Sequence, residues 1–269
     1  MRGVGTAALL SVALPGGLYW LIGHIAVHPS DEGFLWYGVL QTAAGEIPLR
    51  DFQSYDPGRY YWSAAWSLLL GDGIAALRLS GTLFQALGVF CGLLAARRIT
   101  QNPALLTLIG CVLVLWMFPQ YKFYEHSLTM MAVYLATRLL EDPGLGRHFV
   151  AGLFVGLAAF FGRNHGLYCG LGFLLVILLL HWKRRSELPL LKDLAVWSGG
   201  ILLGVSPLLA MLIFVPGFAA SFFRSLVDFV PLSLAILWPW QLPEGAHGTL
   251  LLGEIGIFVC YLVLPVASP

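Results

Sequence analysis

The stretch that decides the fold is residues 31–62, DEGFLWYGVLQTAAGEIPLRDFQSYDPGRYYW, the longest polar interruption in a very apolar chain. It follows a first apolar run over residues 4–27 and holds five of the 14 acidic residues. Those five are Asp31, Glu32, Glu46, Asp51 and Asp56, with Arg50 and Arg59 among them. Because charged groups within a bilayer are costly unless paired or solvated, we expect this stretch to lie at a membrane surface and to hold the chemistry of the protein.

The composition is that of an all-α polytopic membrane protein. The 269 residues are 58% hydrophobic and 11% charged, with a mean hydropathy of +0.81, whereas soluble domains carry about 25% charged residues. The sequence contains no basic tract, which argues against a nucleic-acid partner. The four cysteines are widely spaced in apolar runs without a CxxC motif, so we interpret them as small buried hydrophobes rather than disulfides or metal ligands.

About eight segments are apolar enough to be predicted as membrane-spanning helices. They cover residues 4–27, 74–96, 103–118, 126–140, 147–162, 165–182, 193–215 and 248–267. The first is too long for the apolar core of a signal peptide, so we predict an uncleaved span. No soluble domain interrupts the series. The sequence therefore predicts one transmembrane module over residues 1–269, with residues 31–72 as its first outer loop.

The apolar run 60–70 is too short to span, and the basic residues decide its placement. If it does not cross and the N-terminus is cytoplasmic, nine of the 15 basic residues lie inside, including the clusters at 97–98 and 183–185. If it did cross, both clusters would lie outside, against the positive-inside rule. We therefore predict that 60–70 is an interfacial or re-entrant helix and that function resides on the non-cytoplasmic side. Residues 31–44 are predicted as an interfacial helix closed by Gly45, followed by a loop over 46–58. A further amphipathic segment is predicted at 216–231.

This topology gathers one set of polar groups on the outer face. Group transfer needs a base that takes a hydroxyl proton and cations that neutralise a departing phosphate, for which arginine is well shaped. The candidate catalytic residues are Asp31 and Glu32. The candidate substrate-binding residues are Asp51, Asp56, Arg59, Lys122, Glu125, His126, Arg163, Asn164 and His165.

Other interpretations of these residues stay open. Asp31-Glu32 also fits a helix N-cap with a solvated neighbour, or a cation or proton site in a transporter. Residues 163–165 fit a short polar loop as well as a phosphate clamp, and Glu125-His126 fits the charge preference of a helix start. Four outer histidines, His24, His28, His126 and His165, show no metal-ligand spacing. We therefore predict no metal and no cofactor, and nothing supports a divalent cation.

Several of these motifs carry a family resemblance. They are Asp31-Glu32-Gly33, GEIPLRDF at 45–52, YDPGRYYW at 55–62, LRLS at 77–80 and AARR at 95–98. Together they resemble the N-terminal part of GT-C fold glycosyltransferases that use polyprenyl-phosphate sugars, the branch of protein mannosyltransferases and lipid A aminoarabinose transferases. The resemblance implies a catalytic carboxylate at Asp31, a second acidic motif at Glu125, and donor-phosphate contacts from 163–166. Family members are usually longer, so we expect a truncated C-terminus.

The expected function is therefore inverting transfer of a sugar from an isoprenoid-phosphate carrier to an acceptor on the non-cytoplasmic face. The partners would be the lipid-linked sugar, the bilayer and an acceptor that the sequence does not identify. A transporter or flippase for a lipid-linked or small anionic solute is the main alternative, and a non-catalytic module is a third.

Overall fold

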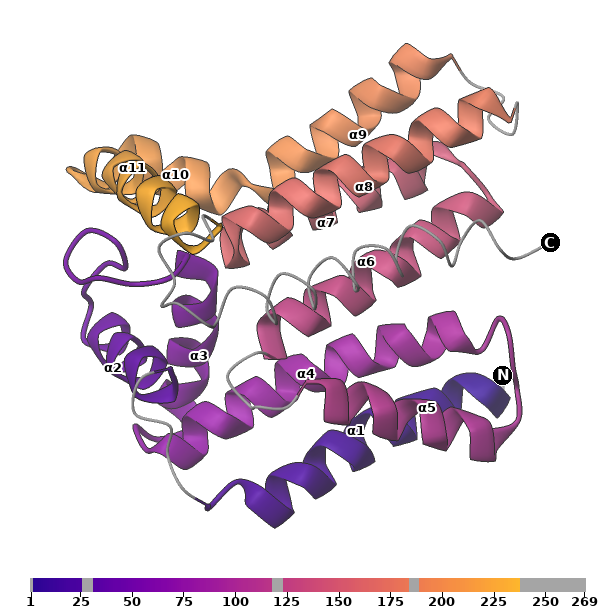
Figure 1. Cartoon of the computed structure of the whole chain (residues 1–269), viewed down its shortest axis with the longest axis horizontal. Coiled ribbons are helices and arrows are strands. Elements are labelled where there is room, and N and C mark those ends of the chain that lie inside the picture. The colour runs from indigo at the N-terminus through magenta and orange to yellow at the C-terminus, as the bar shows by residue number, and fades with distance from the viewer. Residues whose placement is uncertain (1, 26–30, 118–122, 184–188, 238–269) are drawn as a thin grey trace, which may run out of the picture. The chain divides into compact units, whose positions relative to one another are not determined.

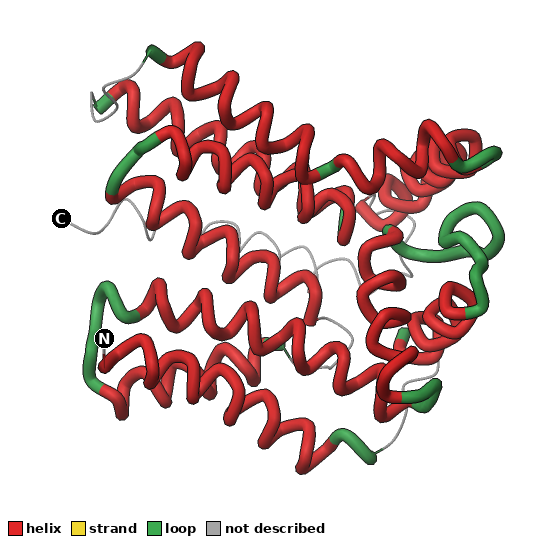
Figure 2. Tube along the Cα trace, turned by 180° about the vertical axis from the view of Figure 1, so that it is seen from behind, coloured by secondary structure: helices red, strands yellow, loops and turns green. Residues whose placement is uncertain are grey.

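The computed structural model describes residues 2–25, 31–117, 123–183 and 189–237. This part of the chain is helical, with eleven helices and no strand longer than one isolated bridge between Pro48 and Phe52 (Figures 1 and 2). The helices are α1 (Arg2–Ile22), α2 (Glu32–Ala43), α3 (Pro57–Leu70), α4 (Ile74–Ala96), α5 (Pro103–Trp116), α6 (Phe123–Glu141), α7 (Leu145–Phe161), α8 (Arg163–Trp182), α9 (Leu190–Gly204), α10 (Ser206–Phe214) and α11 (Phe218–Leu237). The predicted all-helical class is confirmed.

The chain divides into two compact units, residues 1–218 and 219–269. The first unit holds helices α1 to α10 and every polar cluster described below. In the second unit the structure describes α11, which continues to Leu237 where the sequence predicted an amphipathic segment ending at 231.

Three helices of the described part are long and apolar enough to cross a membrane: Val4–Ile22, α4 and α8. Helices α9 and α10 meet at a bend of 55° and give a fourth span if the pair is counted as one. Helices α5 and α7 are apolar but have only 14 and 17 residues, and α6 does not meet the same criterion. The predicted segment 248–267 lies outside the described residues. Helix lengths therefore establish three or four candidate spans rather than eight.

The first loop contains the two helices that its sequence predicted. Helix α2 ends before Gly45, whose φ of 97° is in the left-handed region that glycine tolerates. Helix α3 starts at Pro57, because the fixed φ of proline suits the first helical turn. It has 14 residues, or about 21 Å, which is shorter than a hydrocarbon core of about 30 Å. The helix that contains residues 60–70 is therefore too short to cross the hydrocarbon core, as predicted.

Helices α2 and α3 lie together at one end of the long helices (Figures 1 and 2). Gly38 of α2 contacts the ring of Tyr60 on α3 so closely that a Cβ at position 38 would lie 2.2 Å from Tyr60 Cε1. The Tyr60 hydroxyl accepts a hydrogen bond from the backbone N–H of Tyr55 at 3.0 Å. The non-spanning helix is therefore held by packing against α2 and by its own preceding loop.

Helices α7 and α9 pack with their backbones in close contact. Each helix carries two glycines four residues apart, Gly152 and Gly156 on α7 and Gly200 and Gly204 on α9. A Cβ on any of the four would come within 1.9–2.3 Å of a backbone carbonyl oxygen of the other helix. Small residues at this spacing let helix backbones approach closely in membranes, where dispersion contacts and not hydrophobic exclusion hold helices together.

We expect Gly200→Ala to destabilise the protein and its neighbour Gly199→Ala to leave it unchanged or slightly more stable. The added methyl at 200 would meet the Phe149 carbonyl oxygen at 2.2 Å, whereas nothing lies within 4 Å of a Cβ at 199. Overpacking of this kind costs about 1–3 kcal/mol, and alanine is the better helix former at an open position. Thermal unfolding of the two purified variants in the same detergent measures the difference. Equal melting temperatures would contradict the close contact.

Candidate functional site

A buried ion pair joins α2 to α4 at the start of the first loop. Arg78 of α4 meets Glu32 of α2 through two parallel hydrogen bonds, Nε to Oε1 at 2.5 Å and Nη2 to Oε2 at 2.8 Å. Its Nη1 donates to the carbonyl oxygens of Gly23 at 2.7 Å and Ile25 at 2.8 Å, just after α1. The Arg78 and Glu32 side chains are only 5% and 9% exposed. The pair thus fixes three helices against one another.

This arrangement separates the two residues that the sequence proposed as catalytic. Both oxygens of Glu32 are bound to the Arg78 guanidinium, which gives Glu32 a positioning role in the fold. Asp31 occupies the N-cap position of α2, is half-buried, and makes no side-chain capping bond there. The two adjacent carboxylates therefore have different surroundings, and only Glu32 is held by Arg78.

A second polar cluster is centred on Arg59 of α3. Its Nη1 lies 2.6 Å from Oε1 of Glu125, in the first turn of α6, and its Nε donates to the carbonyl oxygen of Phe161 at 2.7 Å. The guanidinium stands over the rings of Tyr55 and Tyr124, 5.3 and 5.7 Å from their centroids. Cation–π contacts of this kind strengthen when the groups are desolvated, and the Arg59 side chain is 9% exposed.

Asp56 attaches the N-terminus of α8 to the same cluster. Its Oδ1 lies 2.6 Å from Nε of Arg163, and its Oδ2 accepts the backbone N–H of Arg163 at 2.9 Å. Carboxylates are favoured at this position because the first N–H groups of a helix lack intrahelical partners. The N-terminus of α8 therefore binds a carboxylate through its backbone N–H.

Gly162 allows His165 and Arg59 to approach each other. A Cβ at position 162 would lie 2.9 Å from His165 Nδ1 and 3.2 Å from Arg59 Nη2. Within the described residues, His165 Nδ1 and Glu125 Oε2 are buried and make no hydrogen bond. Burial raises the pKa of the Glu125 carboxyl, but the Arg59 charge, a backbone hydrogen bond and the hydrogen bond from Arg59 together hold that pKa below its usual value. Glu125 therefore carries its charge at neutral pH and can neutralise Arg59.

The structure brings together five of the predicted site residues and separates others. Asp56, Arg59, Glu125, Arg163 and His165 form the cluster just described, which we call the Arg59 cluster. Asn164 is exposed. The His126 ring packs edge-on against Trp116 of α5, with centroids 4.2 Å apart. Lys122 lies outside the described residues.

Asp51 is engaged locally, within the loop between α2 and α3. Its carboxylate pairs with Arg50 at 2.7 Å and accepts the backbone N–H of Ile47 at 2.8 Å. The hydrogen bond from Arg50 and then that from Ile47 hold the pKa of Asp51 below its usual value. This residue therefore closes the turn at 47–51, and no interaction in the described residues links it to the Arg59 cluster.

A connection runs from Asp31 to the Arg59 cluster through aromatic rings. Phe34, one helical turn after Asp31, meets Tyr55 edge-on with centroids 5.1 Å apart. Tyr55 in turn lies beneath the Arg59 guanidinium. The rings of Phe34 and Tyr55 therefore connect the first turn of α2 to the Arg59 cluster.

Sequence reasoning missed two polar groups that organise this region. Arg78 lies in the predicted span 74–96, and no partner was predicted for it. An arginine in an apolar span needs a counterion, and the carboxylates of the first loop were the nearest candidates. The hydroxyl of Tyr124, 2.7 Å from the Ser63 hydroxyl and 3.1 Å from the Arg59 carbonyl oxygen, links α6 to α3. No sequence pattern identifies this second contact, because it depends on how the helices pack.

A third polar cluster lies where α7 and α9 begin and α8 ends, the opposite end of α7 and α8 from Arg163. Asp193 is fully buried, and its Oδ2 lies 3.0 Å from His181 Nε2 and 3.5 Å from His148 Nε2. His148 is also fully buried, and its Nδ1 contacts the Gly144 carbonyl oxygen at 3.1 Å. The described residues contain no group of three His, Cys, Asp or Glu arranged to hold a metal ion. This cluster therefore acts as a polar clamp between three helix ends.

No protein-family model matches the chain, and neither do curated proteins or solved structures. What the structure defines is a class: an all-helical protein whose apolar helices are compatible with several passes through a membrane. Within this fold, the polar clusters around Arg78 and Arg59 lie at the end of the long helices where α2 and α3 pack.

We expect Glu32→Gln to destabilise the protein by about 3–5 kcal/mol, because it leaves the Arg78 charge buried without its counterion. Replacing both partners, Glu32→Leu with Arg78→Met, should recover part of that loss. The exposed pair Arg98–Glu141, 2.7 Å apart, is a matched control, and Glu141→Gln should cost less than about 1 kcal/mol. Denaturant unfolding in detergent measures all three. If Glu32→Gln is as stable as Glu141→Gln, the anchoring role is wrong.

Proposed function

We propose that the protein is a membrane glycosyltransferase that moves a sugar from an isoprenoid-phosphate carrier to an acceptor on the non-cytoplasmic face. The observation that carries the proposal is the Arg59 cluster, in which guanidinium, carboxylate and imidazole groups meet at the starts of α3, α6 and α8. In a chain this apolar, such a concentration of charge is costly and indicates a functional site. The carboxylate is supplied by the half-buried Asp31, one helical turn before Phe34, whose ring contacts Tyr55 under the Arg59 guanidinium.

In the proposed reaction Asp31 takes the proton of the acceptor hydroxyl as that oxygen attacks the anomeric carbon. The bond between this carbon and the carrier phosphate breaks, the configuration inverts, and the lipid phosphate leaves with the electron pair. Arg163 and His165 stabilise the negative charge of the departing phosphate. The beginning of α8 already binds the Asp56 carboxylate, which supports an anion at this helix end.

The proposal includes a finer topology of about eight spans with a cytoplasmic N-terminus. It rests on the distribution of basic residues and on the short length of α3. With α3 lying in the interface, its exposed side chains Leu68 and Leu69, both 77% exposed, would face the acyl chains and offer a path for the prenyl tail. Asp51 then lies outside and Lys183 inside.

Single cysteines at positions 51 and 183, introduced by Asp51→Cys and Lys183→Cys in a cysteine-free background, test this topology. Both positions are exposed, so a membrane-impermeant thiol reagent should reach them if they face it. In intact cells we expect labelling of the first and not of the second, and labelling of both after permeabilisation. Labelling of both in intact cells would put the two residues on one side and overturn the topology together with the site.

A transporter or flippase is the second candidate function, and the α9–α10 pair favours it. These helices form an apolar segment broken by 55° at Val205, with Pro207 in the first turn of α10. Broken helices line the binding sites of many transporters. In proteoliposomes this function would move a lipid-linked or small anionic solute without covalent change, whereas the glycosyltransferase would convert it.

Asp31→Asn should lower sugar transfer by about 10²–10⁴-fold, because the amide keeps the size of the side chain but cannot accept the proton. The matched control is Asp72→Asn, which changes an exposed carboxylate in the turn between α3 and α4. We expect the control to keep the wild-type rate. Transfer is measured in membranes supplied with a polyprenyl-phosphate sugar. A wild-type rate in Asp31→Asn would remove Asp31 from the mechanism.

A further inference from the structure

The ends of the long helices that lie away from α2 and α3 carry an excess of positive charge. Helices α4, α6 and α8 end there, and α5, α7 and α9 begin there (Figures 1 and 2). We call this part of residues 1–218 the basic end. Its described charged side chains are six cations and three carboxylates, which leaves an excess of three positive charges. They are Arg97, Arg98, Arg138, Arg147, Lys183 and Lys192 against Glu141, Asp142 and Asp193.

Each of the three carboxylates is already engaged by another side chain. Glu141 lies 2.7 Å from Arg98, and Asp142 lies 2.9 Å from Arg147. Asp193 is fully buried and contacts the two histidines described above. The carboxylates of the basic end therefore do not neutralise its remaining cations.

Three cations of the basic end have no carboxylate partner among the residues that the structure describes: Arg97, Lys183 and Lys192. Arg97 and Lys183 are the C-cap residues of α4 and α8, where the helix dipole favours a cation. Lys192 lies in the first turn of α9, where the dipole disfavours one. The helix dipoles therefore do not account for all three cations, and a further source of negative charge is needed.

Each of these cations has a large, exposed apolar residue one or two positions away in the chain. These residues are Ile99 at 91%, Trp182 at 80% and Leu191 at 81% exposure. The Lys183 Nζ also lies 5.5 Å from the centre of the Trp182 ring. Cations beside exposed apolar or aromatic side chains are typical of a membrane interface, where the charge reaches the headgroups and the apolar group meets the acyl chains. An anion without acyl chains would leave these apolar side chains uncovered.

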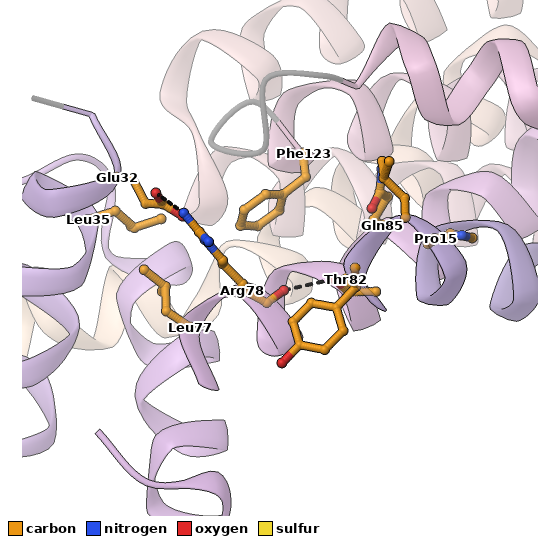
Figure 3. Close-up of a pocket in the computed structure, with 10 residues that line it drawn as sticks. Pro15, Glu32, Leu35, Leu77, Arg78, Thr82, Gln85 and Phe123 are labelled. Carbon is orange, nitrogen blue, oxygen red and sulfur yellow. Dashed lines mark hydrogen bonds and ion pairs between the residues drawn. The ribbon is translucent and has the colours of Figure 1, made fainter. Parts of the chain in front are cut away.

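The end that holds α2 and α3 has the opposite charge balance. Each arginine that the structure describes there has its own carboxylate, as Figure 3 shows for Arg78 and Glu32. Glu46 and Asp72 lie at the same end as additional carboxylates. The other pairs are Arg50 with Asp51, Arg59 with Glu125 and Arg163 with Asp56. Among the described charges, an anionic lipid surface is therefore attracted to the basic end alone.

We propose that the basic end binds anionic phospholipids, with their phosphate groups against Arg97, Lys183 and Lys192. The acyl chains lie against the exposed apolar residue beside each cation. The proposal does not depend on the proposed glycosyl transfer. It also holds in either orientation of the chain, because it concerns one end of the helices and not one named side of the membrane.

Native mass spectrometry of the full chain in detergent tests the proposal by titration with dioleoylphosphatidylglycerol or dioleoylphosphatidylcholine. The two lipids share a phosphate and the same acyl chains, but only the first has a net negative charge. We expect the first phosphatidylglycerol to bind about fivefold more tightly than the first phosphatidylcholine, the size expected for one lysine or arginine near anionic lipid. Ammonium phosphate should not compete, because it lacks acyl chains. Equal affinity for the two lipids, or displacement of the lipid by phosphate, would overturn the proposal without any variant.

One combined variant and two controls locate the binding. Arg97→Gln, Lys183→Gln and Lys192→Gln together should reduce the affinity for phosphatidylglycerol to that for phosphatidylcholine. The combination Arg97→Lys, Lys183→Arg and Lys192→Arg keeps the three charges and should keep the preference. Asp142→Asn with Arg147→Gln removes an ion pair of the same end without changing its net charge, and the preference should again remain. If the folded triple glutamine variant still prefers phosphatidylglycerol, or if either control loses the preference, the three unpaired cations are not the binding site.

Discussion

The ion pair between Arg78 and Glu32 is the interaction on which this end of the molecule depends. Two charges removed from water cost several kcal/mol each unless hydrogen bonds replace their hydration. Here both carboxylate oxygens are bound, and Arg78 Nη1 is bound by two carbonyl oxygens that follow α1. These hydrogen bonds offset the cost of burying the pair only while α1, α2 and α4 keep their mutual positions. Such a pair gives little net stability but imposes a strict geometry.

The positions of α1, α2 and α4 in turn determine the position of Arg59, because α2 packs against α3. Helix α2, fixed by Glu32, presents Gly38 to the ring of Tyr60. Helix α3, held in this way, carries Arg59 to Glu125. At the opposite ends of α7 and α8, Asp193 and its histidines bind three helix ends together. The packed α7–α9 pair is therefore held by polar contacts where both helices begin. At the end of α7, the Phe161 carbonyl oxygen accepts a hydrogen bond from Arg59.

Local features of this fold could be predicted from the sequence, and tertiary ones could not. The starts and ends of α2 and α3 follow from Pro57, Gly45 and the length of the apolar run, which act within a few residues. The five residues of the Arg59 cluster come from three loops that the predicted topology assigns to one side, and the structure brings them into contact. The partner of Glu32 was missed, since it lies 46 residues away and nothing local connects the two. Eight spans were predicted from apolar runs, but α5 and α7 form only 14 and 17 helical residues.

The ion pair between Arg78 and Glu32 also explains why the adjacent carboxylates Asp31 and Glu32 have different surroundings. Successive residues of a helix point about 100° apart, so Asp31 and Glu32 cannot both face Arg78. Glu32 points into the protein and pairs with Arg78. Asp31 is half-buried at the N-cap, one turn before Phe34, whose ring contacts Tyr55. A base must exchange a proton during each turnover, and a carboxylate held by two hydrogen bonds to an arginine is poorly suited to this task. The ion pair therefore accounts for Glu32, and the reaction proposed above assigns the base to its neighbour Asp31.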